Sequence, residues 1–536
     1  MRVAFISNAY ESMGFENLSA VLKKAGHEVR LFMDPELFND SDTTISPLGR
    51  FFDFKPQLLA DLKPFKPDLV AFSVITDSFL WAADLARRIK KEMNVPIIFG
   101  GIHATSSPDS VIANDCIDMV CLGEGEYAML DLVESMARGE TDLSIKNIWF
   151  KRDGKIIKND LRPLIEDLDT LPLADKNLYY SVSPHFRFCY YTLTNRGCPH
   201  ACSYCIHSYF RKLYRGKGTY CRQRSVSHVI QELVQAKRLY NISLVRFMDD
   251  CFPSEPGWLN EFKEKYAQEV GLPFLCYLYP CQVTTEVLET LQASGCVEIN
   301  LGIQSWDENV RKKVLHRMED NKTLEKLLDI CSRFKFSYVL DIISGIPGEN
   351  IDSLFEFLQM CRAKRFLSVN FYWLKYYPAV TITEEAYKNG VITCEQVSKT
   401  AEGKLGRNFA VGGDTENADS KKLYLFFLVC RYLPARTARW LYQRKAYRYM
   451  PGFVPLRILY FFWNFPANNY ELKYIHKMQT FYYRHFILTR LKQHLGQAWC
   501  SLKKCARCLF PNQGAQRLVQ NEDRPAGEKA KPTLKS

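Results

Sequence analysis

Residues 195–205 read NRGCPHACSYC and place three cysteines, Cys198, Cys202 and Cys205, in the spacing C-x3-C-x2-C. The segment follows the apolar run Phe188–Leu193, which is typical of a buried β-strand. Cysteine thiolates are the usual ligands of iron–sulfur clusters, and three of them within eight residues can hold one face of such a cluster. Three protein ligands would leave one iron of a four-iron cluster open, and an open metal position is where chemistry takes place.

A zinc site is an alternative for these cysteines. Zinc would require a fourth ligand, which His200 or His207 could provide from the same stretch of sequence. Three unrelated thiols are a further alternative. The cluster is favoured because a Gly-Cys-Pro turn directly after a predicted strand is a specific context.

The motif resembles the signature of the radical S-adenosylmethionine (SAM) enzymes, and Tyr204 lies where that family commonly has an aromatic residue. The resemblance implies a [4Fe–4S] cluster on Cys198, Cys202 and Cys205, which are then both the metal ligands and the catalytic centre. It also implies that the fourth iron binds the amino and carboxylate groups of SAM. One-electron reduction would cleave SAM to methionine and a 5′-deoxyadenosyl radical.

Residues 186–378 predict a partial (β/α)6 barrel of the TIM type. Apolar strand patterns alternate with helical patterns such as Val226–Leu239, and the predicted strands are Phe188–Leu193, Leu244–Met248, Phe274–Leu278, Glu298–Gly302, Tyr338–Ile343 and Val369–Leu374. The site of such a barrel lies at the carboxyl ends of its strands.

Polar residues gather at those predicted strand ends, where buried polar groups are costly without a ligand or partner. The resemblance implies that these positions contact SAM, namely Asp249, Asp250, Gln304, Ser344 and Gly345. Gln304 departs from the glutamate that the family usually has. Asp249 or Asp250 could instead cap a helix that begins near Ser254.

Residues 1–145 predict a Rossmann-like, flavodoxin-like α/β domain with a parallel sheet covered on both faces. The predicted strands are Val3–Ser7, Glu28–Phe32, Leu69–Val74, Pro96–Gly101 and Met119–Gly123. Ligands of such sheets bind beyond the carboxyl ends of the strands. Neither GxGxxG nor GxxxxGK[ST] follows the first strand, so dinucleotide and nucleoside-triphosphate binding are disfavoured. A purely structural or dimerisation domain remains an alternative.

Three segments precede the cysteine motif in a fixed order: GGIHAT at 100–105, LGEGE at 122–126 and DLDTLP at 167–172. Together they resemble the cobalamin-binding radical SAM enzymes over residues 1–375. The resemblance implies a cobalamin held between the α/β domain and the open barrel by residues at the strand ends: Asn8, Ser73, Thr76, Gly100, Gly101, His103, Gly123 and Glu124.

The motif DxHxxG, which supplies a histidine ligand in other cobalamin proteins, is absent from the sequence. The resemblance therefore implies a cobalamin whose nucleotide tail is displaced and whose cobalt has no histidine ligand. His103 is expected to line the pocket of the tail, with ligation of cobalt as the alternative.

The resemblance implies methylation of an unactivated carbon of a small-molecule substrate through a 5′-deoxyadenosyl radical and methylcobalamin. A reductant such as flavodoxin or ferredoxin would supply electrons. The alternatives are a non-methylating cyclase or oxidase with the same cofactors, and a cobalamin-binding sensor with a structural cluster. Methylthiolation of nucleic acid is disfavoured, because Cys116, Cys121 and Cys189 are too scattered to form a second cluster.

The composition is that of an ordinary globular protein: 536 residues with 47% hydrophobic and 24% charged residues. Met1–Tyr10 is typical of a strand rather than of a signal peptide, and the apolar run Leu423–Cys430 has only eight residues. We therefore expect a cytoplasmic protein. Its 18 cysteines then favour metal or redox chemistry, with the remainder as buried thiols.

The net charge of +12 is concentrated near the C-terminus, where residues 421–510 hold 17 Lys and Arg but one acid, Glu471. With its many aromatic residues, the region 379–512 is predicted to be helical, either as a cap over the barrel or as a contact with the anionic inner membrane surface. Membrane contact would suit a lipid or other apolar substrate. Nucleic acid is less favoured, because no recognised motif accompanies the charge.

The remaining segments have simpler predictions. Residues 146–185 are expected to be a linker, and residues 513–536 a disordered tail. The spacing Cys500-x4-Cys505-x2-Cys508 could bind a second cluster or zinc, although surface thiols are the simpler interpretation.

Overall fold

The computed structural model describes residues 1–38, 46–364, 366, 368–404, 422–423, 425–426, 430, 433–450, 470 and 480–492. The chain forms two compact units, residues 1–482 and 483–536. The sheets, the barrel and the site all lie in the first unit. Cys500, Cys505 and Cys508, and the predicted tail 513–536, lie outside the described residues.

The N-terminal sheet has the order β2-β1-β3-β4-β5-β6-β7. Its first five strands are parallel, and their order 2-1-3-4-5 is that of flavodoxin-like folds, which confirms the predicted fold. The strands are β1 (Arg2–Ser7), β2 (Glu28–Met33), β3 (Leu69–Ser73), β4 (Ile97–Gly100) and β5 (Met119–Cys121).

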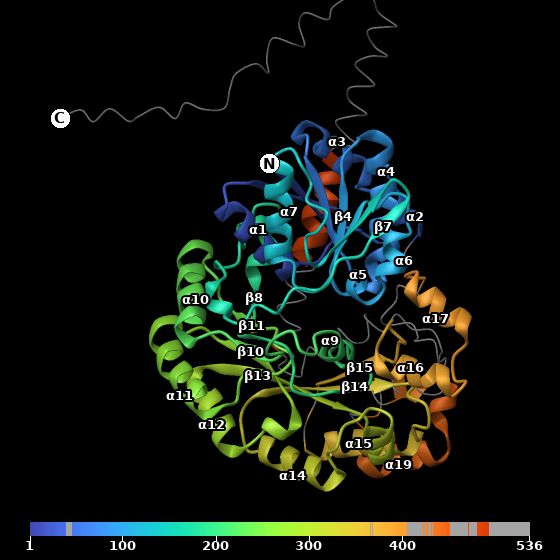
Figure 1. Cartoon of the computed structure of the whole chain (residues 1–536). Helices are drawn as coiled ribbons and strands as arrows, with labels where there is room; N and C mark the ends of the chain where they lie inside the picture. The colour runs from blue at the N-terminus through green and yellow to red at the C-terminus, as the bar shows by residue number, and fades with distance from the viewer. Residues whose placement is uncertain are drawn as a thin grey trace, which may run out of the picture. The chain divides into compact units, whose positions relative to one another are not determined.

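Helices cover both faces of this sheet (Figure 1). One buried cluster joins α1 (Met13–Lys24) and α7 (Glu126–Ala137) to Val3 and Phe5. The other joins α3 (Lys55–Phe65), α4 (Phe79–Glu92) and α6 (Pro108–Ile112) to Ala4 and Ile6. Side chains of a strand alternate between the two faces, so helices on both faces can bury the apolar residues of the parallel strands.

The predicted linker 146–185 is partly folded into this sheet. Strands β6 (Ile148–Arg152) and β7 (Lys155–Ile157) form an antiparallel hairpin that extends the sheet beyond β5. Asp153 and Gly154 connect them, both with positive φ (50° and 72°), which is the backbone of a tight hairpin turn. The expectation of a linker missed this Asp-Gly signal.

The second sheet contains six parallel strands in the order β15-β14-β13-β12-β11-β8 and confirms the predicted partial barrel. The strands are β8 (Tyr190–Thr192), β11 (Val245–Phe247), β12 (Phe274–Leu278), β13 (Cys296–Gln304), β14 (Ser337–Ser344) and β15 (Ser368–Trp373). The helices that pack on their outer face are α10 (Val226–Tyr240), α11 (Pro256–Lys265), α12 (Thr285–Ser294), α14 (Asn321–Cys331) and α15 (Ile351–Ala363).

Short elements surround the carboxyl edge of the barrel. Strand β9 (Asn195–Arg196) pairs with β10 (Arg222–Gln223), and α9 (His207–Leu213) follows the cysteine loop. The described C-terminal elements are the helices α16 (Thr381–Lys388), α17 (Cys394–Ala401) and α19 (Ala435–Gln443) and the 3-10 turn η6 (Ala446–Tyr449). Within the described ranges, no helix is long and apolar enough to cross a membrane.

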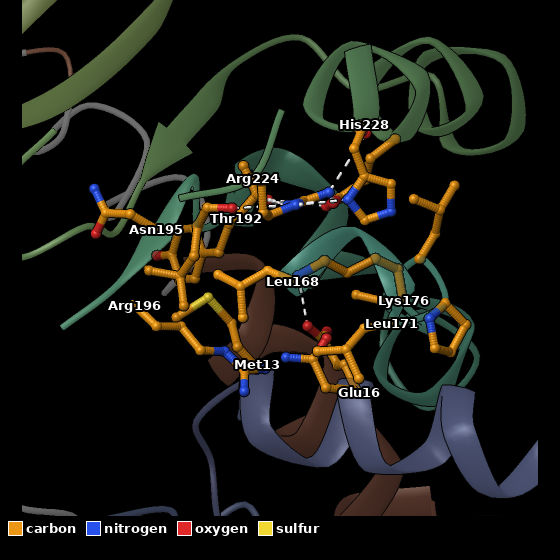
Figure 2. A pocket seen from close by; sticks show the side chains of 17 residues that line it. Met13, Glu16, Leu168, Leu171, Lys176, Thr192, Asn195, Arg196, Arg224 and His228 are labelled. Atoms are coloured by element: carbon orange, nitrogen blue, oxygen red, sulfur yellow. Dashed lines mark hydrogen bonds and ion pairs between the residues drawn. The ribbon is translucent and has the colours of Figure 1, made fainter. Parts of the chain in front are cut away.

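The segment around Leu168, Leu171 and Lys176 is wedged between α1 and the start of the barrel, as Figure 2 shows. Lys176 is buried, and its Nζ lies 2.8 Å from Glu11 and 2.6 Å from Glu16. The pKa of Lys176 stays above its usual range, because these carboxylates outweigh the burial that would lower it. A buried charge needs such partners to remain ionised, so this ion cluster fixes the segment to the α/β domain, which carries both Glu11 and Glu16.

Lys176→Ala should lower the free energy of unfolding by about 3–5 kcal/mol, because Glu11 and Glu16 would lose the charge that neutralises them. Denaturant titration of the purified chain measures this change. Lys23→Ala is the control, since the Lys23 side chain pairs with Asp175 while it is still 39% exposed, and its loss should cost at most about 1 kcal/mol. Equal losses in both variants would contradict the role of the buried cluster.

Candidate functional site

The cysteine loop begins with a turn that only glycine can make. Gly197 has φ of +89°, and a Cβ there would lie 2.2 Å from the carbonyl oxygen of Tyr220. Cys198 and Cys202 follow as buried thiols and Cys205 as a half-buried one. The loop is tied to the barrel by a hydrogen bond from Ser203 N to the carbonyl oxygen of Leu315 (3.1 Å).

The two histidines of the zinc alternative make other contacts. The ring of His200 stacks on Tyr279 at 3.4 Å, and both ring nitrogens of His207 are hydrogen bonded, to Tyr220 (2.5 Å) and Asp250 (2.7 Å). Among the described residues, no group of three His, Cys, Asp or Glu side chains could surround a single metal ion. A cluster spreads its thiolates over several iron atoms, so three thiols on one loop fit a cluster better than zinc.

A fourth cysteine, which the sequence analysis missed, lies beside this loop. The sulfur of Cys251 is 3.8 Å from the sulfur of Cys198 and lowers the pKa of the Cys198 thiol by hydrogen bonding. Burial raises the pKa of Cys202 and Cys205 instead. Cys251 directly follows Asp249 and Asp250, which were predicted to lie at the end of a barrel strand, and this position was the signal that could have found it.

Asp249 holds the chain just before the loop. One carboxylate oxygen accepts hydrogen bonds from Thr194 N (2.7 Å), Thr194 Oγ1 (2.9 Å) and Asn195 N (2.8 Å). The other oxygen, Oδ2, is buried without a hydrogen-bond partner. Burial raises the pKa of Asp249 to about 7. Neither Asp249 nor Asp250 caps a helix, because Glu255 caps α11.

The other predicted SAM contacts lie at the same edge, on β13 and β14. Ser344 is buried, and its hydroxyl has no hydrogen-bond partner. Gly345 follows with φ of +81°. Gln304 ends β13 with φ of +69°, where the pairing with β14 is irregular, and a positive φ at a residue other than glycine is often a feature of a functional site. The unpartnered polar atoms of Asp249 and Ser344 fit a polar ligand such as SAM.

Arg317 is a second residue that the sequence did not reveal. It is buried, lies 4.1 Å from the ring centroid of Tyr279, and donates to the carbonyl oxygen of Gly302 (2.7 Å) and to Tyr204 OH (3.3 Å). Its charge lies close enough to Cys202 to oppose the effect of burial on the pKa of that thiol. Arg317 belongs to no predicted strand end, so only the tertiary structure brings it to the loop.

A cavity of about 430 Å³ lies between the carboxyl edges of the two sheets. The α/β domain contributes five of the residues predicted to bind cobalamin: Ser73, Gly100, Gly101, Gly123 and Glu124. The barrel side contributes Arg196, Gly197, His207 and Asp250 from the cysteine loop and the end of β11. Phe15, Leu18, Met129 and Phe210 give this cavity an apolar lining beside the polar strand ends, and its place between the two domains is the one expected for cobalamin.

Three predicted cobalamin contacts do not line this cavity. Asn8 donates to Glu36 (3.1 Å). Thr76 and His103 are buried and hydrogen bonded to each other through Oγ1 and Nδ1 (3.1 Å). Burial lowers the pKa of His103 to about 4, so the imidazole is neutral at physiological pH, and its Nε2 has no hydrogen-bond partner.

Four charged residues join the two edges next to the cavity. Arg196 pairs with Glu124 (3.1 Å) and Glu126 (2.6 Å), and Arg222 pairs with Glu124 (2.9 Å). The carboxylate of Glu124 also accepts from Ile165 N (2.9 Å). Arg196 outweighs the effect of burial and keeps the pKa of Glu126 below its usual value. Glu124, predicted as a cofactor contact, is thus foremost a link between the domains.

Comparisons with known proteins match both domains. Residues 2–133 match the B12 binding domain family, and residues 192–361 match the Radical SAM superfamily. An uncharacterized methyltransferase of Pyrococcus horikoshii is 25% identical over 342 residues, which are 62% of this chain and 72% of the relative. The anaerobic magnesium-protoporphyrin IX monomethyl ester cyclase of Rubrivivax gelatinosus is 30% identical over 394 residues, 68% of this chain and 66% of the relative.

Among solved structures, the chain is similar to TsrM from Kitasatospora setae, a radical SAM methyltransferase solved with tryptophan and a SAM analogue. The TM-score is 0.59 with 17% identity, over 73% of this chain and 76% of that chain. At this level of identity the likeness shows the fold, with an α/β domain followed by a partial barrel.

Because the pKa of Asp249 is raised, we expect the effect of Asp249→Asn on thermal stability to depend on pH. With a pKa of about 7 when folded and roughly 4 when unfolded, the folded state binds the extra proton between these values. Folding therefore becomes less favourable as pH rises from 4 to 7, by up to about 1.4 kcal/mol per pH unit. The amide cannot ionise, so the melting temperature of the variant relative to the parent should rise between pH 5.5 and pH 8.

Asp320→Asn is the control for this measurement. Asp320 is an exposed helix cap with a lowered pKa, so it is ionised at both pH values and its substitution should have a constant effect. Differential scanning calorimetry of the three proteins provides the comparison. If the melting temperature of Asp249→Asn differs from that of the parent by the same amount at both pH values, the raised pKa of the buried carboxyl would be contradicted.

Proposed function

We propose that this chain, which belongs to the cobalamin-binding radical SAM enzymes, transfers a methyl group to an unactivated carbon of a small-molecule substrate. The observation that carries the proposal is the shared cavity. Its walls come from the strand ends of the B12-binding domain and from the cysteine loop of the radical SAM domain. Radical generation and methyl donation would therefore meet in one space.

The residues divide into three groups by the cofactor that each would hold. The cluster would be held by Cys198, Cys202 and Cys205. SAM would be contacted by Tyr204, Asp249, Asp250, Gln304, Ser344 and Gly345. Cobalamin would be contacted by Asn8, Ser73, Thr76, Gly100, Gly101, His103, Gly123 and Glu124. When bound there, SAM at the cluster supplies the 5′-deoxyadenosyl radical and cobalamin supplies the methyl group.

The protein's own contribution is position and exclusion of water. Asp249 fixes the backbone of Thr194 and Asn195 and so aims the cysteine loop. The ion pairs of Arg196 hold the loop against the α/β domain. His207, oriented from both sides by Tyr220 and Asp250, gives the barrel wall of the cavity a fixed polar surface.

A second candidate function is ring closure or oxidation with the same cofactors. The 30% identity with the Rubrivivax gelatinosus cyclase supports it. Methyl transfer is favoured by the similarity to the Pyrococcus horikoshii methyltransferase. A cobalamin sensor with a structural cluster is disfavoured, because sensing does not need a barrel with unpartnered polar atoms at its active edge.

The partners are proposed from the chemistry of the site. Flavodoxin or ferredoxin would deliver single electrons to the cluster. The substrate would be a small molecule, lipid or otherwise apolar, since apolar side chains line much of the cavity. We propose a cytoplasmic enzyme whose C-terminal basic region contacts the anionic inner membrane surface.

Anaerobic reconstitution tests the proposed reaction. The full chain is loaded with iron, sulfide and hydroxocobalamin and treated with dithionite and SAM, and 5′-deoxyadenosine, methionine and S-adenosylhomocysteine are measured. We expect all three products. Cys202→Ala should reduce 5′-deoxyadenosine at least about 100-fold, because one cluster ligand is lost. Cys394→Ala, an exposed cysteine on α17, should behave like the parent.

The product pattern separates the alternatives. Formation of 5′-deoxyadenosine without S-adenosylhomocysteine would favour the cyclase or oxidase over the methyltransferase. Absence of both products from protein with a full complement of iron would contradict radical chemistry and favour the sensor. Products that persist in Cys202→Ala would contradict the assignment of the cluster ligands.

A further inference from the structure

Helix α19 (Ala435–Gln443) is attached to the outside of the barrel by one face. The ring of Tyr442 stacks on Phe355 of α15 with centroids 3.6 Å apart and planes at 4°. The hydroxyl of Tyr442 donates to Asp352 at 2.6 Å, and Ala438 is buried in the same contact. These contacts fix the orientation of α19, so its other face has a defined direction.

That other face is strongly basic. Residues three and four apart lie on one side of a helix, and this spacing gathers exposed side chains on the outer side of α19: Arg436, Arg439, Trp440, Gln443 and Arg444. The indole of Trp440 is 48% exposed and has the guanidinium of Arg444 over its ring at 4.2 Å. The turn η6 continues this surface with Lys445 and with Tyr449, which is 89% exposed.

The surface has little opposing charge. No Asp or Glu occurs between Leu433 and Met450, while five Lys and Arg do. Within the part of the chain that the structure describes, Arg436, Arg439 and Lys445 form no ion pair. At the contact of α15 with Tyr442, Asp352 accepts a hydrogen bond from the tyrosine hydroxyl and Glu356 adds negative charge. Acidic groups thus lie at the attached face and cations at the free one.

We propose that α19 and η6 form a docking surface for an anionic lipid bilayer. Guanidinium groups bind phosphate well, and each basic residue near an anionic membrane strengthens attachment. Tryptophan and tyrosine prefer the boundary between water and lipid, because each has an apolar ring and a polar tip. An indole surrounded by three arginines on one helix face matches that boundary better than it matches a protein groove.

This inference does not depend on the proposed methyl transfer. The docking surface lies on α19, outside the barrel. The cofactor cavity lies between the barrel and the α/β domain. An enzyme with a different reaction would bind the bilayer equally well.

Sedimentation with vesicles tests the docking surface on the full chain. Vesicles of phosphatidylcholine are compared with vesicles that contain phosphatidylglycerol, at low and high salt. We expect binding only to the anionic vesicles, and loss of that binding at high salt because screening weakens the attraction. The double variant Arg436→Glu/Arg439→Glu should weaken binding by at least about 25-fold, since each basic contact is worth roughly fivefold.

Two further variants make the measurement specific. Lys322→Glu/Lys326→Glu changes the net charge equally, on the exposed side of α14, and should leave vesicle binding within about threefold of the parent. Trp440→Ala keeps every charge and should still weaken binding several-fold through the lost indole. Melting temperature and iron content, measured on all variants, verify that the fold is retained.

Several outcomes would overturn the proposal. Equal losses in the α19 and α14 double variants would show attraction by net charge alone. Unchanged binding in Arg436→Glu/Arg439→Glu would place attachment elsewhere in the chain. A further contrary result is that single-stranded RNA binds the chain at a lower concentration than anionic vesicles do, and that the same α19 variants abolish this binding. This result would make the surface a nucleic-acid surface instead.

Discussion

The architecture depends on the ion pairs that Arg196 makes across the two domains. Arg196 stands two residues before the first cysteine of the loop, and its guanidinium is held by Glu124 and Glu126 of the α/β domain. Charges removed from water in this way are stable only when their partners stay in place, so neither edge can move alone. The same pairs therefore fix the cysteine loop and one wall of the cavity.

A second set of contacts aligns the loop within the barrel. Asp249 accepts three hydrogen bonds from Thr194 and Asn195, and the turn at Gly197 leaves no space for a side chain. Together with the hydrogen bond from Arg317 to Tyr204, these contacts hold the backbone of the loop that carries the three cysteines. Preorganisation of this kind spares a site the cost of ordering itself during the reaction.

The segment between the domains has a larger role than a connector. It adds a hairpin to the first sheet and then buries Lys176 between α1 and the barrel, where Glu11 and Glu16 neutralise it. Two separate ion clusters thus involve the α/β domain. The pairs of Arg196 join it to the cysteine loop, and the pairs of Lys176 join it to the connecting segment. The apolar core is also continuous across this boundary, because one buried cluster contains Val3 and Phe5 of the first sheet and Val245 and Phe247 of the barrel. Buried charges and apolar packing therefore fix the domain orientation together.

The sequence by itself determined the two sheets, because alternating apolar strands and amphipathic helices have few other ways to bury their apolar residues. It also determined the candidate cluster ligands, because Cys198, Cys202 and Cys205 are close in the chain. Only the tertiary structure decided which distant groups surround that loop. Cys251, Arg317 and the Glu124–Arg196 pair come from separate elements, and His103 lies beneath the cavity rather than in it. Spacing along a chain encodes local geometry, whereas contacts between strand ends depend on how whole elements pack.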